Sequence, residues 1–141
     1  MFIGEFRHTV DEKGRLIMPS KFRDGLNDRF VATRGLDNCL FVYPLSEWAS
    51  LEEKLKTLPF TRAETRAFTR LFLAGASECE IDKQGRFVVP VPLREYAGLE
   101  KDVVIIGVSS RIEIWSQAGW DEYMKGAGEK YEEFAENLVG I

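Results

Sequence analysis

The chain has 141 residues, of which 45% are hydrophobic and 30% charged, a balance typical of a folded protein rather than a disordered one. Its apolar runs fall short of the roughly 18 residues that a membrane-spanning helix needs. The N-terminus lacks the basic flank and apolar core of a signal peptide. We therefore expect a cytoplasmic protein without a membrane partner.

The net charge of −4 disfavours nucleic acid as a partner, but the charge is unevenly distributed. Residues 1–35 carry seven Lys/Arg and five Asp/Glu, a net of +2, whereas residues 101–141 carry four and eight, a net of −4. Because screening limits the reach of each charge to about 10 Å, one face can be basic while the whole chain is acidic.

The first part of the chain predicts two strands joined by a turn. Polar and apolar residues alternate over 5–10, which indicates a half-buried strand. The polar stretch 11–14 follows, in which Asp11 can cap the turn through its side chain and Gly14 can adopt positive φ. Residues 15–18 then predict a short apolar strand.

A short helix and a hairpin complete this first region. Pro19 cannot donate to a sheet and ends the strand, and Ser20 is expected to cap a helix that runs through Leu26. An apolar hairpin follows, with strands over 30–33 and 40–43.

Helical spacing of apolar residues predicts a helix over 45–58 that stops at Pro59. Thr61 and Glu64 form a capping-box pattern for a second helix that reaches about Leu73. Three arginines recur at every fourth position on this helix: Arg62, Arg66 and Arg70. They form either a solvated, salt-bridged face or an auxiliary phosphate contact.

The C-terminal segment 116–139 is amphipathic, with an apolar stripe and an acidic opposite face. Gly126 and Gly128 are expected to weaken the helix midway. The apolar stripe packs either on its own domain or on a neighbouring subunit.

The chain repeats itself at an offset of 71 residues. Residues 11–23 read DEKGRLIMPSKFR and residues 82–94 read DKQGRFVVPVPLR. Five positions are identical, where chance gives roughly one: Asp11/Asp82, Gly14/Gly85, Arg15/Arg86, Pro19/Pro90 and Arg23/Arg94. The second hairpin is expected over 103–108 and 112–115. The predicted division is a first unit over 4–48, a helical linker over 49–74, a second unit over 75–120 and a helical tail over 121–141.

Either unit alone buries too little surface to be stable, so the two must pack on each other, by intertwining. The two cysteines, Cys39 and Cys79, are expected to be buried hydrophobes, since a zinc site needs about four ligands. His8 falls on the inward face of its strand and is interpreted as a core histidine with a hydrogen-bond partner. The same count of ligands leads us to expect no metal. With no catalytic triad and no phosphate-binding GxxxxGK loop in the sequence, we expect no enzyme.

The D-x-x-G-R stretch, followed by apolar residues, Pro and Arg, resembles the SpoVT/AbrB-type swapped-hairpin DNA-binding unit. The tandem arrangement, the Met1–Gly4 start, the Leu36–Trp48 stretch and the Ala76–Cys79 stretch resemble the MraZ family over about residues 1–139. The resemblance implies an α+β, β-rich fold in which two tandem units form an intrachain pseudo-dimer, with linking and C-terminal helices. It also implies that chains assemble into a ring-like homo-oligomer.

The resemblance further implies a nucleoid-associated transcriptional regulator that uses no cofactor. Its partner would be double-stranded DNA with short direct repeats, in the promoter of the division and cell-wall gene cluster. The runner-up is a ring-forming scaffold that binds another protein instead of DNA. Salt-dependent affinity for promoter DNA would separate the two.

The family resemblance places the DNA-contacting role on the motif arginines, Arg15 and Arg86. An alternative role for Arg15 is to pair with Asp11 and brace the turn. The other candidate DNA-binding residues are Arg7, Lys13, Lys21, Arg23 and Lys83. The second copy has Glu78, Gln84 and Pro92 where the first has Arg7, Lys13 and Lys21. We therefore expect the first copy to make most of the contact with DNA. The residues expected to shape the turns are Asp11, Gly14, Asp82 and Gly85.

Overall fold

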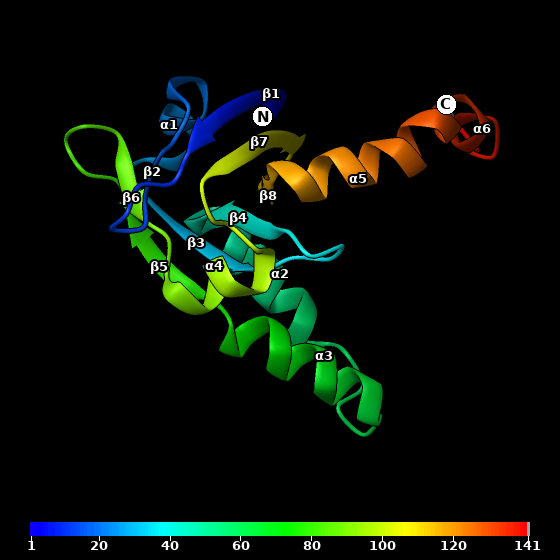
Figure 1. The fold of residues 1–141 in the computed structure, drawn as a ribbon. Helices are drawn as coiled ribbons and strands as arrows, with labels where there is room; N and C mark the ends of the chain where they lie inside the picture. The colour runs from blue at the N-terminus through cyan, green and yellow to red at the C-terminus, as the bar shows by residue number, and fades with distance from the viewer. Residues whose placement is uncertain (141) are drawn as a thin grey trace.

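The computed structural model describes residues 1–140, so Ile141, the last residue of the predicted tail, lies outside the described part. The first half contains β1 (Phe2–Thr9), β2 (Arg15–Ile17), α1 (Ser20–Leu26), β3 (Arg29–Arg34), β4 (Leu40–Pro44), α2 (Leu45–Lys56) and α3 (Ala63–Ala74). The second half contains β5 (Ser77–Glu80), β6 (Arg86–Val88), α4 (Val91–Ala97), β7 (Asp102–Ser109), β8 (Arg111–Ser116), α5 (Gln117–Ala127), the 3₁₀ turn η1 (Gly128–Lys130) and α6 (Tyr131–Glu136). The predicted strands, hairpins and helices are confirmed, and the fold is α+β (Figure 1).

Within residues 1–140, six strands form one antiparallel sheet in the order β1-β7-β8-β4-β3-β5, and β2 pairs with β6 in a separate two-stranded ribbon. The first strand of each half pairs with the hairpin of the other half: β1 with β7, from Phe2 opposite Ser109 to Thr9 opposite Asp102, and β5 with β3. Because these backbone groups find their partners across the halves, neither half completes its own hydrogen bonding.

One face of the sheet packs against α1, α4 and the β2–β6 ribbon in the main core. Leu16 and Met18 from the first half and Phe87 and Val89 from the second are all buried there. Phe30 of β3 meets Phe87 of β6 edge to face, with ring centroids 4.9 Å apart. The core is therefore shared between the two halves, as intertwining requires.

The other face of the sheet is covered by α2, α3 and α5. The C-terminal end of α3 is fixed to β3, because the Thr33 hydroxyl donates to the carbonyl of Phe72 at 2.5 Å and Arg34 Nη1 donates to the carbonyl of Leu71 at 2.6 Å. As a result, α2 and α3 stand on the side of the molecule away from the ribbon (Figure 1).

The expected cap of the first helix is wrong. Ser20 is the first helical residue of α1, Pro19 occupies the cap position, and the described residues provide no side-chain cap. The ring of proline restricts its φ, which is −50° at Pro19, and proline has no backbone N–H. It can therefore precede the helix without a capping side chain.

The expected capping box of the second helix is also wrong. Helix α3 begins at Ala63 with Arg62 in the cap position, and no side chain within residues 1–140 caps it. Arg66 Nη1 instead donates to the carbonyls of Phe60 and Thr61, at 3.1 and 3.0 Å. Arg66, one turn into the helix, thus fixes the connecting loop, whereas a capping box would have accepted the free N–H groups at the start of the helix.

Cys39 and Cys79 are buried free thiols, as predicted, and burial raises the pKa of Cys79 to about 11. His8 is half-buried rather than in the core, and its ring makes no hydrogen bond to residues 1–140, so that prediction is wrong. Its strand, β1, is the edge of the sheet and is incompletely covered. Burial, and secondarily Arg23, lower the pKa of His8 below its usual value.

The tail divides at the predicted weak point. Helix α5 ends at Ala127 and η1 begins at Gly128. Trp120 of α5 packs on Trp115, with ring centroids 5.2 Å apart, so this half packs on its own domain. The residues beyond Gly128 extend away from the body (Figure 1). Among the described residues, none of the helices is both long and apolar enough to cross a membrane.

Candidate nucleic-acid interface

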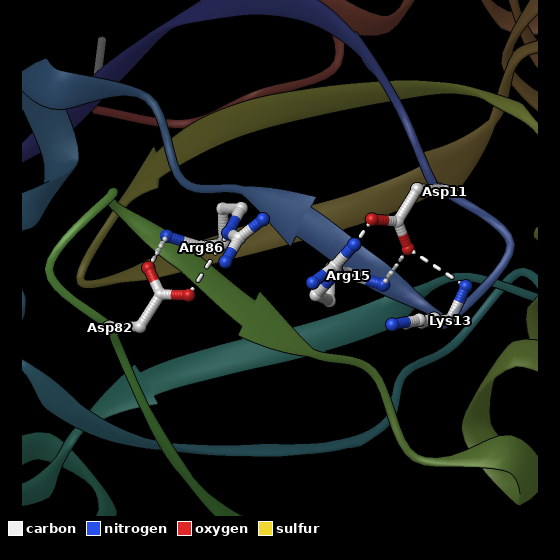
Figure 2. Close-up of polar contacts among 5 residues, drawn as sticks. All are labelled: Asp11, Lys13, Arg15, Asp82 and Arg86. Carbon is white, nitrogen blue, oxygen red and sulfur yellow. Dashed lines mark hydrogen bonds and ion pairs between the residues drawn. The ribbon is translucent and has the colours of Figure 1, made fainter.

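The first motif turn is held by one carboxylate. Asp11 Oδ1 accepts the backbone N–H groups of Lys13 and Arg15 at 2.9 and 2.8 Å, and Asp11 Oδ2 accepts Arg15 Nε at 2.6 Å (Figure 2). Gly14 has φ of +79°, a conformation that glycine adopts without strain. The hydrogen bond from the backbone N–H of Arg15 is the main cause that lowers the pKa of Asp11 below its usual value.

The second motif turn repeats this geometry. Asp82 Oδ1 accepts the N–H groups of Gln84 and Arg86, both at 2.9 Å, and Oδ2 accepts Arg86 Nε at 3.0 Å (Figure 2). Gly85 has φ of +80°. In both turns the aspartate accepts backbone N–H groups and the glycine adopts positive φ, as expected of residues that shape a turn.

Each motif turn is also in close contact with an arginine from the other half. A Cβ on Gly14 would lie 2.7 Å from Cζ of Arg94, and a Cβ on Gly85 would lie 2.7 Å from Cζ of Arg23. Nε of Arg23 donates to the carbonyl of Met18 at 3.0 Å, which fixes that guanidinium in place. Arg23 therefore has a structural contact, and its expected contact with DNA stays a prediction.

The two motif arginines share the outer face of the β2–β6 ribbon. The register pairs Arg15 with Val88, Leu16 with Phe87, and Ile17 with Arg86. Leu16 and Phe87 are buried, so the flanking residues point outward, and Ile17 and Val88 are 41% and 57% exposed. Figure 2 shows the arginines on neighbouring strands.

Sequence reasoning missed Ile17 and Val88 as surface residues because it treated 15–18 as uniformly apolar. Strict alternation from the buried Leu16 would have identified Ile17 as outward-facing. The pairing of β2 with β6, which places Val88 opposite Arg15 and Ile17 opposite Arg86, has no signal in the local sequence.

Arg15 is compatible with both roles considered for it. Its Nε braces the turn through Asp11, while its Nη1 and Nη2 make no hydrogen bond within the part of the chain that the structure describes. The two terminal nitrogens of a guanidinium are the donors of a bidentate contact. The hydrogen bond from Nε to Asp11 therefore orients the guanidinium and leaves these two donors available.

The remaining candidate cations are more scattered. Lys13 and Lys83 are exposed in the two turns. Arg7 lies on the edge strand β1, with Nη2 3.7 Å from Oε2 of Glu5, and Lys21 lies in the first turn of α1. As far as residues 1–140 show, neither Arg7 nor Lys21 bonds to a motif turn.

These features define a class: a tandem-repeat α+β protein whose halves exchange strands and together present an arginine-bearing ribbon. A family model described as "MraZ protein, putative antitoxin-like" matches residues 1–71 and again residues 72–140. The chain belongs to the MraZ family.

The family assignment is supported along the whole chain. A relative named transcriptional regulator MraZ from Desulforamulus reducens is 60% identical over 141 residues, covering 100% of this chain and 99% of the relative. Relatives of the same name from Natranaerobius thermophilus and Moorella thermoacetica are 63% and 58% identical over 139 residues, each covering 99% of this chain and 97% of the relative.

Proposed function

We propose that this chain is a sequence-specific DNA-binding transcriptional regulator that uses the β2–β6 ribbon to bind short direct repeats in the promoter of the division and cell-wall gene cluster. The observation that carries the proposal is the outer face of the ribbon, where Arg15 and Arg86 lie at diagonal positions on paired strands, each oriented by an aspartate through Nε. The relatives that carry the name transcriptional regulator MraZ support the proposal.

The ribbon fits the chemistry of the major groove. A two-stranded ribbon is narrow enough to enter the groove, where a guanidinium can donate two hydrogen bonds to O6 and N7 of guanine. Lys13 and Lys83, at the turns beside the arginines, would contact the flanking phosphates, and Arg7, Lys21 and Arg23 would add further backbone contacts. Ile17 and Val88 would contact the C5 methyl groups of thymine.

In this proposal the exchanged strands make the two units, residues 4–48 and 75–120, a SpoVT/AbrB-type swapped-hairpin pair within one chain. Residues 49–74 link them and 121–141 form the tail. Copies of the chain assemble into a ring in the cytoplasm, associated with the nucleoid. A ring gains affinity from repeated sites, because each further repeat is bound at a high effective concentration.

Salt dependence tests the function directly. Filter binding of the duplex upstream of the chain's own gene should weaken by about 100-fold between about 50 and about 200 mM salt, as neutralising about four phosphates requires. A shuffled duplex of equal length is the control and should bind more weakly at both concentrations. A protein-binding scaffold would show no affinity for either duplex, and that result would refute the proposal.

Uracil substitution tests the apolar residues of the ribbon. Uracil lacks only the C5 methyl group of thymine, so replacing the thymines of the footprinted repeat should weaken binding by about fourfold for each contacted methyl. Ile17→Ser should weaken binding to the thymine duplex and reduce the difference between the duplexes. Leu36→Ser, an exposed apolar residue outside the ribbon, serves as the control. Equal affinity of the wild-type chain for both duplexes would exclude methyl contacts.

A further inference from the structure

Helices α2 and α3 enclose an apolar groove of about 480 Å³ on the side of the molecule away from the ribbon. Leu58, Phe60 and Leu73 line it, together with the charged residues Arg66 and Arg70. Phe60 is 77% exposed. Apolar surface of this kind, bordered by charged residues, is characteristic of a protein-binding site.

The groove is basic, because Lys56, Arg66 and Arg70 are the charged residues among those that line it, although Lys56 also pairs with Glu53. Residues 54–74 carry five Lys/Arg and one Asp/Glu, a net of +4. Arg62 and Arg70 have no acidic partner among residues 1–140, and Arg66 donates only to backbone carbonyls. The occupant of the groove should therefore be apolar on one face and acidic on the other.

The end of the tail has this complementary character. Residues 128–139 carry four Asp/Glu and one Lys/Arg, a net of −3. Tyr131, Phe134 and Leu138, at helical spacing, are all exposed, Tyr131 by 76%. In Figure 1 this segment and α3 point away from the body in different directions, so the tail does not cover the groove of its own chain.

We propose that residues 128–139 of one chain dock in the α2–α3 groove of a second copy. The inference rests on the proposed self-assembly and names its contact. Because the tail and the groove are different surfaces, the contact is heterologous, and repeating it closes a ring when the rotation between copies permits. The contact lies away from the ribbon, so every copy keeps its arginines accessible.

Two complementary variants test the contact. The tail variant combines Tyr131→Ser with Phe134→Asp, and the groove variant combines Phe60→Asp with Arg70→Glu. All four side chains are exposed, so the folded chain should tolerate the changes. Val91→Asp, an exposed apolar residue outside both surfaces, is the matched control. Light scattering coupled to size-exclusion chromatography measures the mass of each, and circular dichroism checks the fold.

The wild-type chain and the Val91 control should form the same oligomer. Each interface variant should be a monomer, with a dissociation constant raised by at least about 30-fold. An equimolar mixture of the two variants should form a one-to-one dimer that grows no further, because one intact groove meets one intact tail. This recovery also demonstrates that both variants are folded.

Three results would overturn the proposal: a monomeric wild-type chain, an interface variant that keeps the wild-type mass, or a mixture that stays monomeric. A tail-to-tail contact, for example, would leave the groove variant assembled. Failure of the DNA-binding proposal would be distinguishable, because it would appear in filter binding of the wild-type chain while the masses behaved as expected.

Discussion

Arg15→Ala is expected to abolish specific DNA binding while leaving the fold and the oligomer intact. Losing one bidentate contact to guanine lowers affinity by about 10- to 100-fold, and the loss multiplies over copies that bind together. The fold should tolerate the change, because an ion pair exposed like that of Arg15 with Asp11 contributes at most about 1 kcal/mol. Filter binding and light scattering on the same preparation measure the two effects separately.

Two further substitutions serve as controls for this result. Arg15→Lys keeps the positive charge but lacks the two parallel donors of a guanidinium. It should therefore retain salt-dependent, nonspecific binding and lose the preference for the repeat. Arg86→Ala should weaken binding less than Arg15→Ala, because Glu78 and Gln84 stand where the first copy has Arg7 and Lys13. Equal losses would refute this asymmetry, and normal binding by Arg15→Ala would refute the role of Arg15.

Phe87→Ala is expected to lower the free energy of unfolding by about 3–5 kcal/mol. Phe87 is 2% exposed, and its ring packs edge to face on Phe30 of the other half. Truncation would leave a cavity at the point where the two halves share their core. Because one sheet joins the halves, urea unfolding at fixed protein concentration should remain a single transition.

The next residue provides the matched control. Val88 lies on the same strand but points outward, so Val88→Ala should change the free energy of unfolding by no more than about 0.5 kcal/mol. The pair thus separates packing from recognition: Phe87 acts through stability, and Val88 is expected to act through DNA. A cost below about 1 kcal/mol for Phe87→Ala, or two separate unfolding transitions, would contradict a shared core.

Local chemistry was sufficient to predict most of the secondary structure. Alternation over 5–10, the turn at 11–14 and the helical spacing over 45–58 each depend on residues close in sequence, and each corresponds to an element of the structure. The offset of 71 residues also paired the two motif turns, whose hydrogen bonds are the same. The helix caps were wrong because a capping pattern does not fix the residue at which the helix begins, and Pro19 and Arg62 occupy the two cap positions. At the second helix, the side chain of Arg66 holds the preceding loop.

The sequence by itself determined the strands, the turns and the duplication, since hydrophobic periodicity, glycine and aspartate act within a few residues of one another. Only the tertiary structure decided which strands pair, because β1 and β7 are brought together by burial of a core that neither half has alone. The same long-range pairing placed Arg15 opposite Val88 and Arg86 opposite Ile17 on one outward face. It also left the end of the tail uncovered, since whether an apolar stripe is buried depends on the surface that the rest of the chain leaves free.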